Sequence, residues 1–131
     1  MATDPTRYYE VKGQVCPLLC SVNSAIAVAN NTQLIAGIAA VAGASAAKKI
    51  RVMGWIMQSG SATVPGIQLK SASGGTMLTV PLAISPNTAG VYTFLPIVDC
   101  GYFETNAGEG LFCDVTGAVM NASIFYITYT P

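Results

Sequence analysis

Apolar and polar residues alternate along much of this chain, in short stretches that end at glycine, proline, serine or asparagine. This alternation has the period of a β-strand, and the residues between the stretches favour turns. The longest stretch covers residues 49–58. Its alternate positions form two apolar sets, namely Ile50, Val52 and Ile56 on one face and Met53, Trp55 and Met57 on the other. We therefore expect a central strand that is covered on both faces.

Further short strands are expected at residues 67–70, 77–84, 91–95, 101–105, 110–115 and 122–130. The signal between residues 22 and 47 is mixed, because alanine favours helix while Asn30, Asn31 and two glycines interrupt it. We interpret this region as two strands, residues 22–29 and 33–40, with a helix across 34–47 as the main alternative. Eight or nine strands predict an all-β fold, an antiparallel β-sandwich of jelly-roll-like topology.

The first 20 residues lack this alternation, and Pro5 and Pro17 interrupt any helix. We expect residues 1–20 to form an extended N-terminal arm, followed by a single domain over residues 21–131. Arg7, Tyr8 and Tyr9 are of the types that anchor interfaces, which favours an arm that lies on a partner. A frayed terminus is the alternative.

Composition suggests that neighbours cover much of the surface. Only 9% of the residues are charged, 52% are hydrophobic and the net charge is zero, whereas a soluble domain has about 25% charged residues. Such a surface associates readily, so we expect a homo-oligomer. The second apolar face of the long strand, with Met53, Trp55 and Met57, is a candidate interface. A monomer with a surface of serine, threonine and glycine is the alternative.

Positive and negative charges separate along the chain. All six basic residues lie at or before Lys70, and after it only four charges follow, which are Asp99, Glu104, Glu109 and Asp114. The first part carries +4, from six basic residues and two acids, and the second carries −4. We expect one edge of a subunit to meet the oppositely charged edge of its neighbour.

The chain contains no histidine, which excludes Ser-His-Asp and Cys-His catalysis. The four cysteines, Cys16, Cys20, Cys100 and Cys113, do not have zinc-ribbon spacing. We expect reduced thiols, no metal and no cofactor, with a disulfide between Cys100 and Cys113 left open. No phosphate-binding glycine loop occurs, and the prediction is that the chain is not an enzyme.

Nucleic acid and membrane are not expected partners. Lys48, Lys49 and Arg51 are the only basic cluster, which is too small for a nucleic-acid site. The longest apolar stretch, residues 34–47, is shorter than the ~20 residues of a transmembrane helix. The first twelve residues show no hydrophobic core of a signal peptide.

From about Gln33 to the end, the layout is similar to that of one class of viral protein. Its features are the sequence of residues 47–52 that opens the long strand, a Gly-Gly hairpin, residues 79–82, residues 101–111 and the final aromatic strand. This layout resembles small structural proteins of tailed phages that have a jelly-roll-like β-sandwich. Capsid decoration (cement) proteins and head- or tail-fibre modules belong to this class.

The resemblance implies a virion protein on the outer capsid surface, often a trimer. Such a protein binds the major capsid protein where capsomers meet and stabilises the head. The alternative is a fibre or tail module that binds a glycan or protein on the host surface. Tyr102, Glu104 and Asn106 are the candidate loop site for that ligand, although such a cluster more often forms a tight turn.

Overall fold

The computed structural model describes residues 7–88 and 90–131, and these residues form strands and no helix. The all-β antiparallel sandwich expected from the sequence is confirmed. The strands are β1 (Tyr8–Val11), β2 (Gln14–Pro17), β3 (Leu19–Ile26), β4 (Thr32–Ile35), β5 (Lys49–Ser59), β6 (Gly66–Ser71), β7 (Leu82–Ala83), β8 (Thr93–Leu95), β9 (Phe103–Glu104), β10 (Leu111–Thr116) and β11 (Met120–Tyr129).

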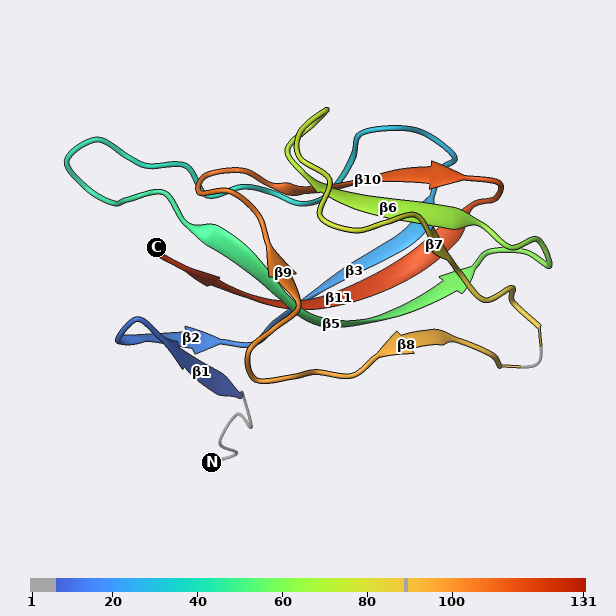
Figure 1. The fold of residues 1–131 in the computed structure, drawn as a ribbon, viewed down its shortest axis with the longest axis horizontal. Helices are drawn as coiled ribbons and strands as arrows, with labels where there is room; N and C mark the ends of the chain where they lie inside the picture. Colours follow the sequence, from blue (N-terminus) through green and yellow to red (C-terminus); the bar gives the residue numbers. More distant parts are fainter. Residues whose placement is uncertain (1–6, 89) are drawn as a thin grey trace.

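Two sheets face each other across one core (Figure 1). The first has the order β3-β11-β5-β8, with β9 also paired to β5, and the second has the order β4-β10-β6-β7. The pairs are antiparallel and nested along the chain: β3 with β11, β4 with β10, β5 with β8, and β6 with β7. The chain therefore resembles one long hairpin that has been folded over into a sandwich.

The strands expected at residues 22–29 and 33–40 exist but begin and end earlier, as β3 and β4. The alternative helix across residues 34–47 is wrong. After Ile35 the chain leaves the sheet, and residues 36–48 form a loop with a single isolated bridge between Val41 and Ser45. The glycines and the polar residues around Asn30 thus outweigh the helix propensity of alanine.

The expected long strand is confirmed as β5, but its faces are not as predicted. Val52 pairs with Tyr126 and Gly54 with Phe125, so Met53 is an extra residue without a partner. This β-bulge reverses the alternation within the strand. Ile50 and Val52 before the bulge face the same core as Trp55 and Met57 after it. Ile56, predicted to share a face with Val52, is exposed instead.

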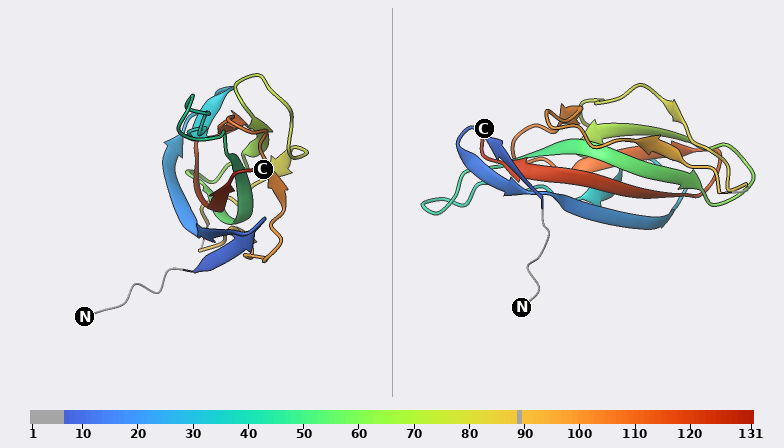
Figure 2. Two further views of the ribbon diagram at one scale, coloured as in Figure 1. Left: turned by 90° about the vertical axis from the view of Figure 1, so that its left-hand side faces the viewer. Right: turned by 90° about the horizontal axis from the view of Figure 1, so that it is seen from below.

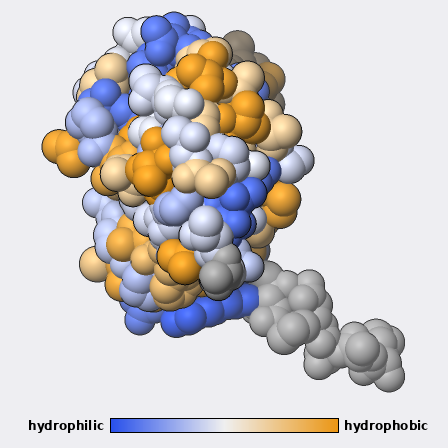
Figure 3. Space-filling view, turned by 90° about the vertical axis from the view of Figure 1, so that its right-hand side faces the viewer, coloured by the Kyte–Doolittle hydropathy of each residue, from blue (hydrophilic) through white to orange (hydrophobic). Residues whose placement is uncertain are grey.

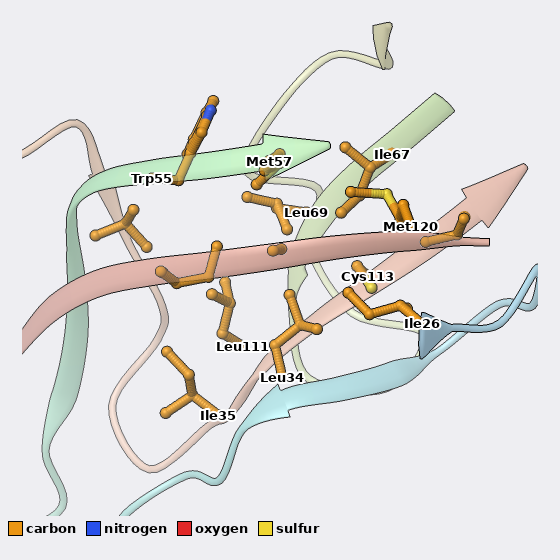
Figure 4. Close-up of a cluster of buried hydrophobic side chains, with 14 of the residues drawn as sticks. Ile26, Leu34, Ile35, Trp55, Met57, Ile67, Leu69, Leu111, Cys113 and Met120 are labelled. Carbon is orange, nitrogen blue, oxygen red and sulfur yellow. The ribbon is translucent and has the colours of Figure 1, made fainter. Parts of the chain in front are cut away.

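The main core lies between the two sheets and consists mostly of aliphatic side chains (Figure 4). Its labelled members are Ile26, Leu34, Ile35, Trp55, Met57, Ile67, Leu69, Leu111, Cys113 and Met120. Most of these side chains are fully buried. Each large one contributes about 1.5–3 kcal/mol of hydrophobic free energy. The core holds the strands in fixed positions, and these strands carry the loops and the outer faces.

The predicted arm is largely a folded hairpin. Of residues 1–20, the first six lie outside the described residues, whereas β1 and β2 pair with each other from Tyr8 to Pro17. The hairpin packs against the outer face of the first sheet (Figure 2). Tyr9 and Cys16 from the hairpin join Met53, Ile127 and Tyr129 in a second core. The expected boundary after residue 20 falls inside β3.

Candidate interaction surfaces

The predicted interface residues of the long strand are not available to a partner. Met53, Trp55 and Met57 are buried inside the subunit. Trp55, which is 6% exposed, packs beside Tyr102 and Phe103, with ring centroids 6.5 and 6.1 Å away. Its Nε1 has no hydrogen-bond partner among the described residues. The second apolar face of β5 thus serves the subunit's own two cores.

The three anchors predicted in the arm have different surroundings. Tyr9 is buried in the second core, and the guanidinium of Arg7 lies 5.3 Å from its ring centroid. Arg7 Nη2 also donates a 3.1 Å hydrogen bond to Asp99 Oδ1 in an exposed ion pair. Tyr8 and Arg7 are both largely exposed. Of the three, only Tyr9 is buried and therefore inaccessible to a partner.

Of the candidate loop residues, Tyr102 and Glu104 line one hollow of about 240 Å³, whereas Asn106 does not belong to it. The Tyr102 hydroxyl donates a 2.6 Å hydrogen bond to the Pro96 carbonyl. The Asn106 amide donates to Glu109 Oε2 at 3.0 Å, which stabilises the turn before β10. Of the three residues, only Asn106 is therefore explained by turn formation.

Glu104 belongs to a separate ion network at the end of β5. Lys49 Nζ lies 3.0 Å from Oε1, Arg51 Nε lies 3.1 Å from Oε2, and the Tyr129 hydroxyl donates a 2.6 Å hydrogen bond to Oε2. Burial alone raises the pKa of Glu104, but hydrogen bonds from Tyr129, Lys49 and Arg51 lower it overall. The carboxylate is thus engaged within the fold.

The charge separation along the chain is used within the subunit. Arg7 pairs with Asp99, Lys49 and Arg51 pair with Glu104, and Lys70 pairs with Asp114. Each pair joins a basic residue at or before Lys70 to an acid that follows Lys70 in the chain. The expectation that these charges attract a neighbouring subunit therefore loses its basis, because most of them are already paired.

One exposed apolar feature is the outer face of the first sheet beyond the hairpin. Register partners across the sheet form one row of side chains, which is Val22 of β3, Ser123 of β11, Ile56 of β5 and Phe94 of β8. Val22 is 75% exposed, Phe94 61% and Ile56 36%. We call the surface formed by this row of four residues the bare sheet face. Strands β3, β8 and β11 contain no charged residue.

A shallow hollow of about 210 Å³ lies next to this row. Three of its polar side chains each bond to the chain through one atom: Asn121 Oδ1 accepts from the Ala25 amide, Gln58 Nε2 donates to the Val91 carbonyl, and Asn23 Nδ2 donates to the Ser21 carbonyl. Tyr92 also lines the hollow and is exposed. The exposed lining of the hollow is mostly apolar.

Two further regions expose hydrophobic side chains. Residues 36–48 form a loop that extends beyond the sheets and contains exposed Ile38 and Val41 (Figure 1). Hydrophobic residues also lie exposed among weakly polar ones at the opposite end of the molecule (Figure 3). Sequence analysis missed the bare sheet face because the bulge at Met53 turns Ile56 outward.

All four cysteines are free thiols; Cys16 and Cys113 are buried, and Cys20 and Cys100 are exposed. Burial, followed by the charge of Asp114, raises the pKa of Cys113 to about 11. The disulfide left open between Cys100 and Cys113 does not form. Among the described residues, no cluster of three or more cysteine or acidic side chains could hold a metal ion.

Comparison of the chain with protein-family models, curated proteins and solved structures gives no match. In the part of the chain that the structure describes, no helix has the length and hydrophobicity needed to span a bilayer.

Proposed function

We propose that this chain is a virion structural protein that decorates the outer surface of a phage capsid. It binds the major capsid protein where capsomers meet and adds contacts that stabilise the head. The observation that carries this proposal is the bare sheet face, where Val22, Ile56 and Phe94 are exposed on a rigid sandwich.

The fold supports this proposal. The nested pairing of eight strands in two four-stranded paths agrees with the expected jelly roll, in which two Greek keys form two packed sheets. The structure has a well-filled core, so its outer face is held in one shape. A decoration protein needs such a platform because attachment acts through surface contacts.

The energetics also fit attachment in many copies. Burying an exposed valine, isoleucine or phenylalanine contributes about 1.5–3 kcal/mol before the costs of association. One small patch therefore binds weakly. On a lattice of repeated sites, linked copies bind with avidity that exceeds the affinity of one contact.

The proposal makes the chain a non-enzymatic protein. It has no histidine, and Asp99, Glu104 and Asp114 all accept ion pairs within the fold. Glu109 is hydrogen-bonded to Ser71 and Asn106. These carboxylates stabilise loops and strands rather than face a common cavity.

A fibre or tail module that binds a host glycan is the second candidate, and exposed Tyr92 beside the hollow favours it. Sugar recognition, however, needs free donors and acceptors beside an aromatic ring. Here one polar atom of each of Asn23, Gln58 and Asn121 already bonds to the chain itself, which reduces the number of groups left for a sugar. The bare sheet face therefore favours attachment to an apolar protein surface.

Quantitative mass spectrometry of purified virions tests the proposal. We expect many copies of this chain per head, in a constant ratio to the major capsid protein. A few copies located at the tail would instead support the fibre function.

A binding experiment tests the surface itself. Phe94→Asp should abolish attachment of the purified protein to heads that lack it. Val80→Asp is the matched control, because Val80 is similarly exposed but lies just before β7 of the other sheet. Equal binding by wild type and Phe94→Asp would overturn the role of the bare sheet face.

A further inference from the structure

Among the described strands, β3 is a long strand with one unpaired edge. In the first sheet β3 is hydrogen-bonded to β11 on one side, and no described strand pairs with its other side. We infer that this edge is an interface, at which β3 of a second copy pairs antiparallel to it about a two-fold axis. The result is a dimer in which the first sheet continues from one subunit into the other.

The other sheet edges are protected by their shortness. Strand β4 has four residues, β7 two and β8 three, whereas β3 has eight. Proteins avoid edge pairing with short strands, prolines, charged side chains or bulges. Strand β3 contains neither proline nor a charged residue.

A bulge limits the free edge to the first part of β3. The register with β11 shifts between Met120 and Ala122, and Ala25 has a φ of 52°. The segment from Leu19 to Asn23 remains regular. It is also fixed in position, because the Ser21 hydroxyl donates a 3.0 Å hydrogen bond to the Leu34 carbonyl. An extended, fixed edge loses little conformational entropy when another strand adds to it.

The absence of charge favours a second copy of this chain as the partner that pairs with the β3 edge. A residue on the two-fold axis faces its own copy, so a charged side chain there would be repelled by the same side chain of the partner. Strands β3 and β11 contain no charge at all. The free segment also presents Val22 and Leu19, both exposed. A partner strand must therefore be uncharged and partly apolar, and this chain's own β3 meets both conditions.

This dimer differs from the trimer that the resemblance implies. It also does not depend on the proposed capsid function, since it concerns only contacts between copies of this chain. If both hold, pairing at β3 joins the two bare sheet faces into one uncharged surface. Each dimer would then attach to a capsid through twice the apolar area that a single subunit offers.

Light scattering of the purified chain at micromolar concentration is the first test. We expect twice the 13.5 kDa mass of one chain. Val22→Lys should give a monomer, because it places like charges across the axis. Val80→Lys is the control, since Val80 is 71% exposed and Val22 is 75%. Circular dichroism should show that both variants remain folded.

Single-cysteine crosslinking is the second test. The background variant carries Cys20→Ser and Cys100→Ser, which remove the exposed thiols. Into this background a single cysteine is introduced at position 20, 22 or 24, one position per variant. Antiparallel partners lie about 5 Å apart, within reach of a disulfide. We expect oxidation to crosslink the position closest to the axis strongly and the others weakly. Val80→Cys should not crosslink.

The outcomes separate clearly. A wild-type monomer, a trimer, or a dimer that survives Val22→Lys would overturn the inference. Loss of the dimer in Val80→Lys as well as in Val22→Lys would also overturn it. A wild-type dimer that fails to bind heads would leave the inference supported while contradicting the proposed function.

Discussion

Met53 and Trp55 face opposite sides of the same sheet, although they are only two positions apart in β5. Met53 lies in the second core with the hairpin, and Trp55 lies in the main core between the sheets. The cause is the β-bulge at Met53. This local change divides the outer face of the first sheet. One end is covered by the hairpin, and the other is the bare sheet face.

Trp55→Ala should destabilise the fold strongly. The indole is buried beside Tyr102 and Phe103, and its removal leaves a large cavity. We expect a loss of about 3–5 kcal/mol in the free energy of unfolding, measured by urea titration. Trp55→Phe is the control. It should cost much less, because the buried Nε1 has no hydrogen bond to lose among the described residues. Equal losses in both variants would contradict the packing described.

The adjacent residues Tyr8 and Tyr9 provide a matched pair. Tyr9→Ala should lower stability by about 3 kcal/mol, because the ring is buried in the second core. Tyr8→Ala should change stability by less than about 0.5 kcal/mol, since Tyr8 is exposed. Tyr9→Phe should be neutral or stabilising, because the Tyr9 hydroxyl is buried without a partner in the described part of the chain. Thermal unfolding of the three variants measures these differences.

Deleting residues 1–17 should destabilise the protein and promote aggregation. The sequence alone predicted that the first 20 residues form an extended arm outside the domain. The structure shows instead that the hairpin covers Met53, Ile127 and Tyr129. Their exposure creates a new apolar patch. Light scattering and thermal unfolding measure the effect, and a deletion variant as stable as wild type would contradict it.

Much of the fold could be predicted because strand and turn signals are local. The alternation over residues 49–58 identified β5 within one residue of its end, and the final strand, expected at residues 122–130, is observed as β11 within two residues of those bounds. The burial of Trp55 followed from the apolar residues on both faces of β5 and is confirmed.

The candidate site could not be predicted in the same way, because it depends on pairing between distant strands. The bulge arises where Gly54 pairs with Phe125 and Val52 with Tyr126. An added Cβ at Gly54 would lie 2.7 Å from the Leu95 carbonyl oxygen, so this glycine allows β8 to approach. No local signal shows that Ile56 then turns outward. The apolar surplus was recognised, but it was assigned to the wrong face.

Asp114→Asn should lower stability by about 3 kcal/mol, because it leaves the buried ammonium of Lys70 without its carboxylate. Lys70 Nζ lies 2.7 Å from Asp114 Oδ1, and the Asn31 amide donates a 2.7 Å hydrogen bond to the same atom. The double variant Lys70→Met, Asp114→Asn is the control. It removes the buried charge, keeps an acceptor for Asn31, and should be more stable than Asp114→Asn in urea titrations.

The same carboxylate should contribute to acid sensitivity. Burial raises the pKa of Asp114, but the hydrogen bonds from Lys70 and Asn31 lower it overall below its ordinary value. Because the folded pKa is below the unfolded one, the stabilisation is complete above the unfolded pKa. It is lost as the pH falls through the folded pKa. Unfolding free energies at acidic pH should therefore fall less steeply in Asp114→Asn than in wild type, and parallel curves would contradict this role.

The four cysteines should divide into two pairs by reactivity with a thiol reagent. Cys20 and Cys100 are exposed and should react in the folded protein at mildly alkaline pH. Cys16 and Cys113 are buried and should react only after unfolding. The barrier at Cys113 is both steric and chemical, because burial raises the pKa of its thiol to about 11 and the thiolate is the reactive form. Mass spectrometry of the labelled protein should show two modified residues in buffer and four in denaturant.

Cys20→Ser and Cys100→Ser together should abolish the reaction in buffer. Labelling of Cys113 in the folded protein would mean that the main core opens readily, contrary to the packing described.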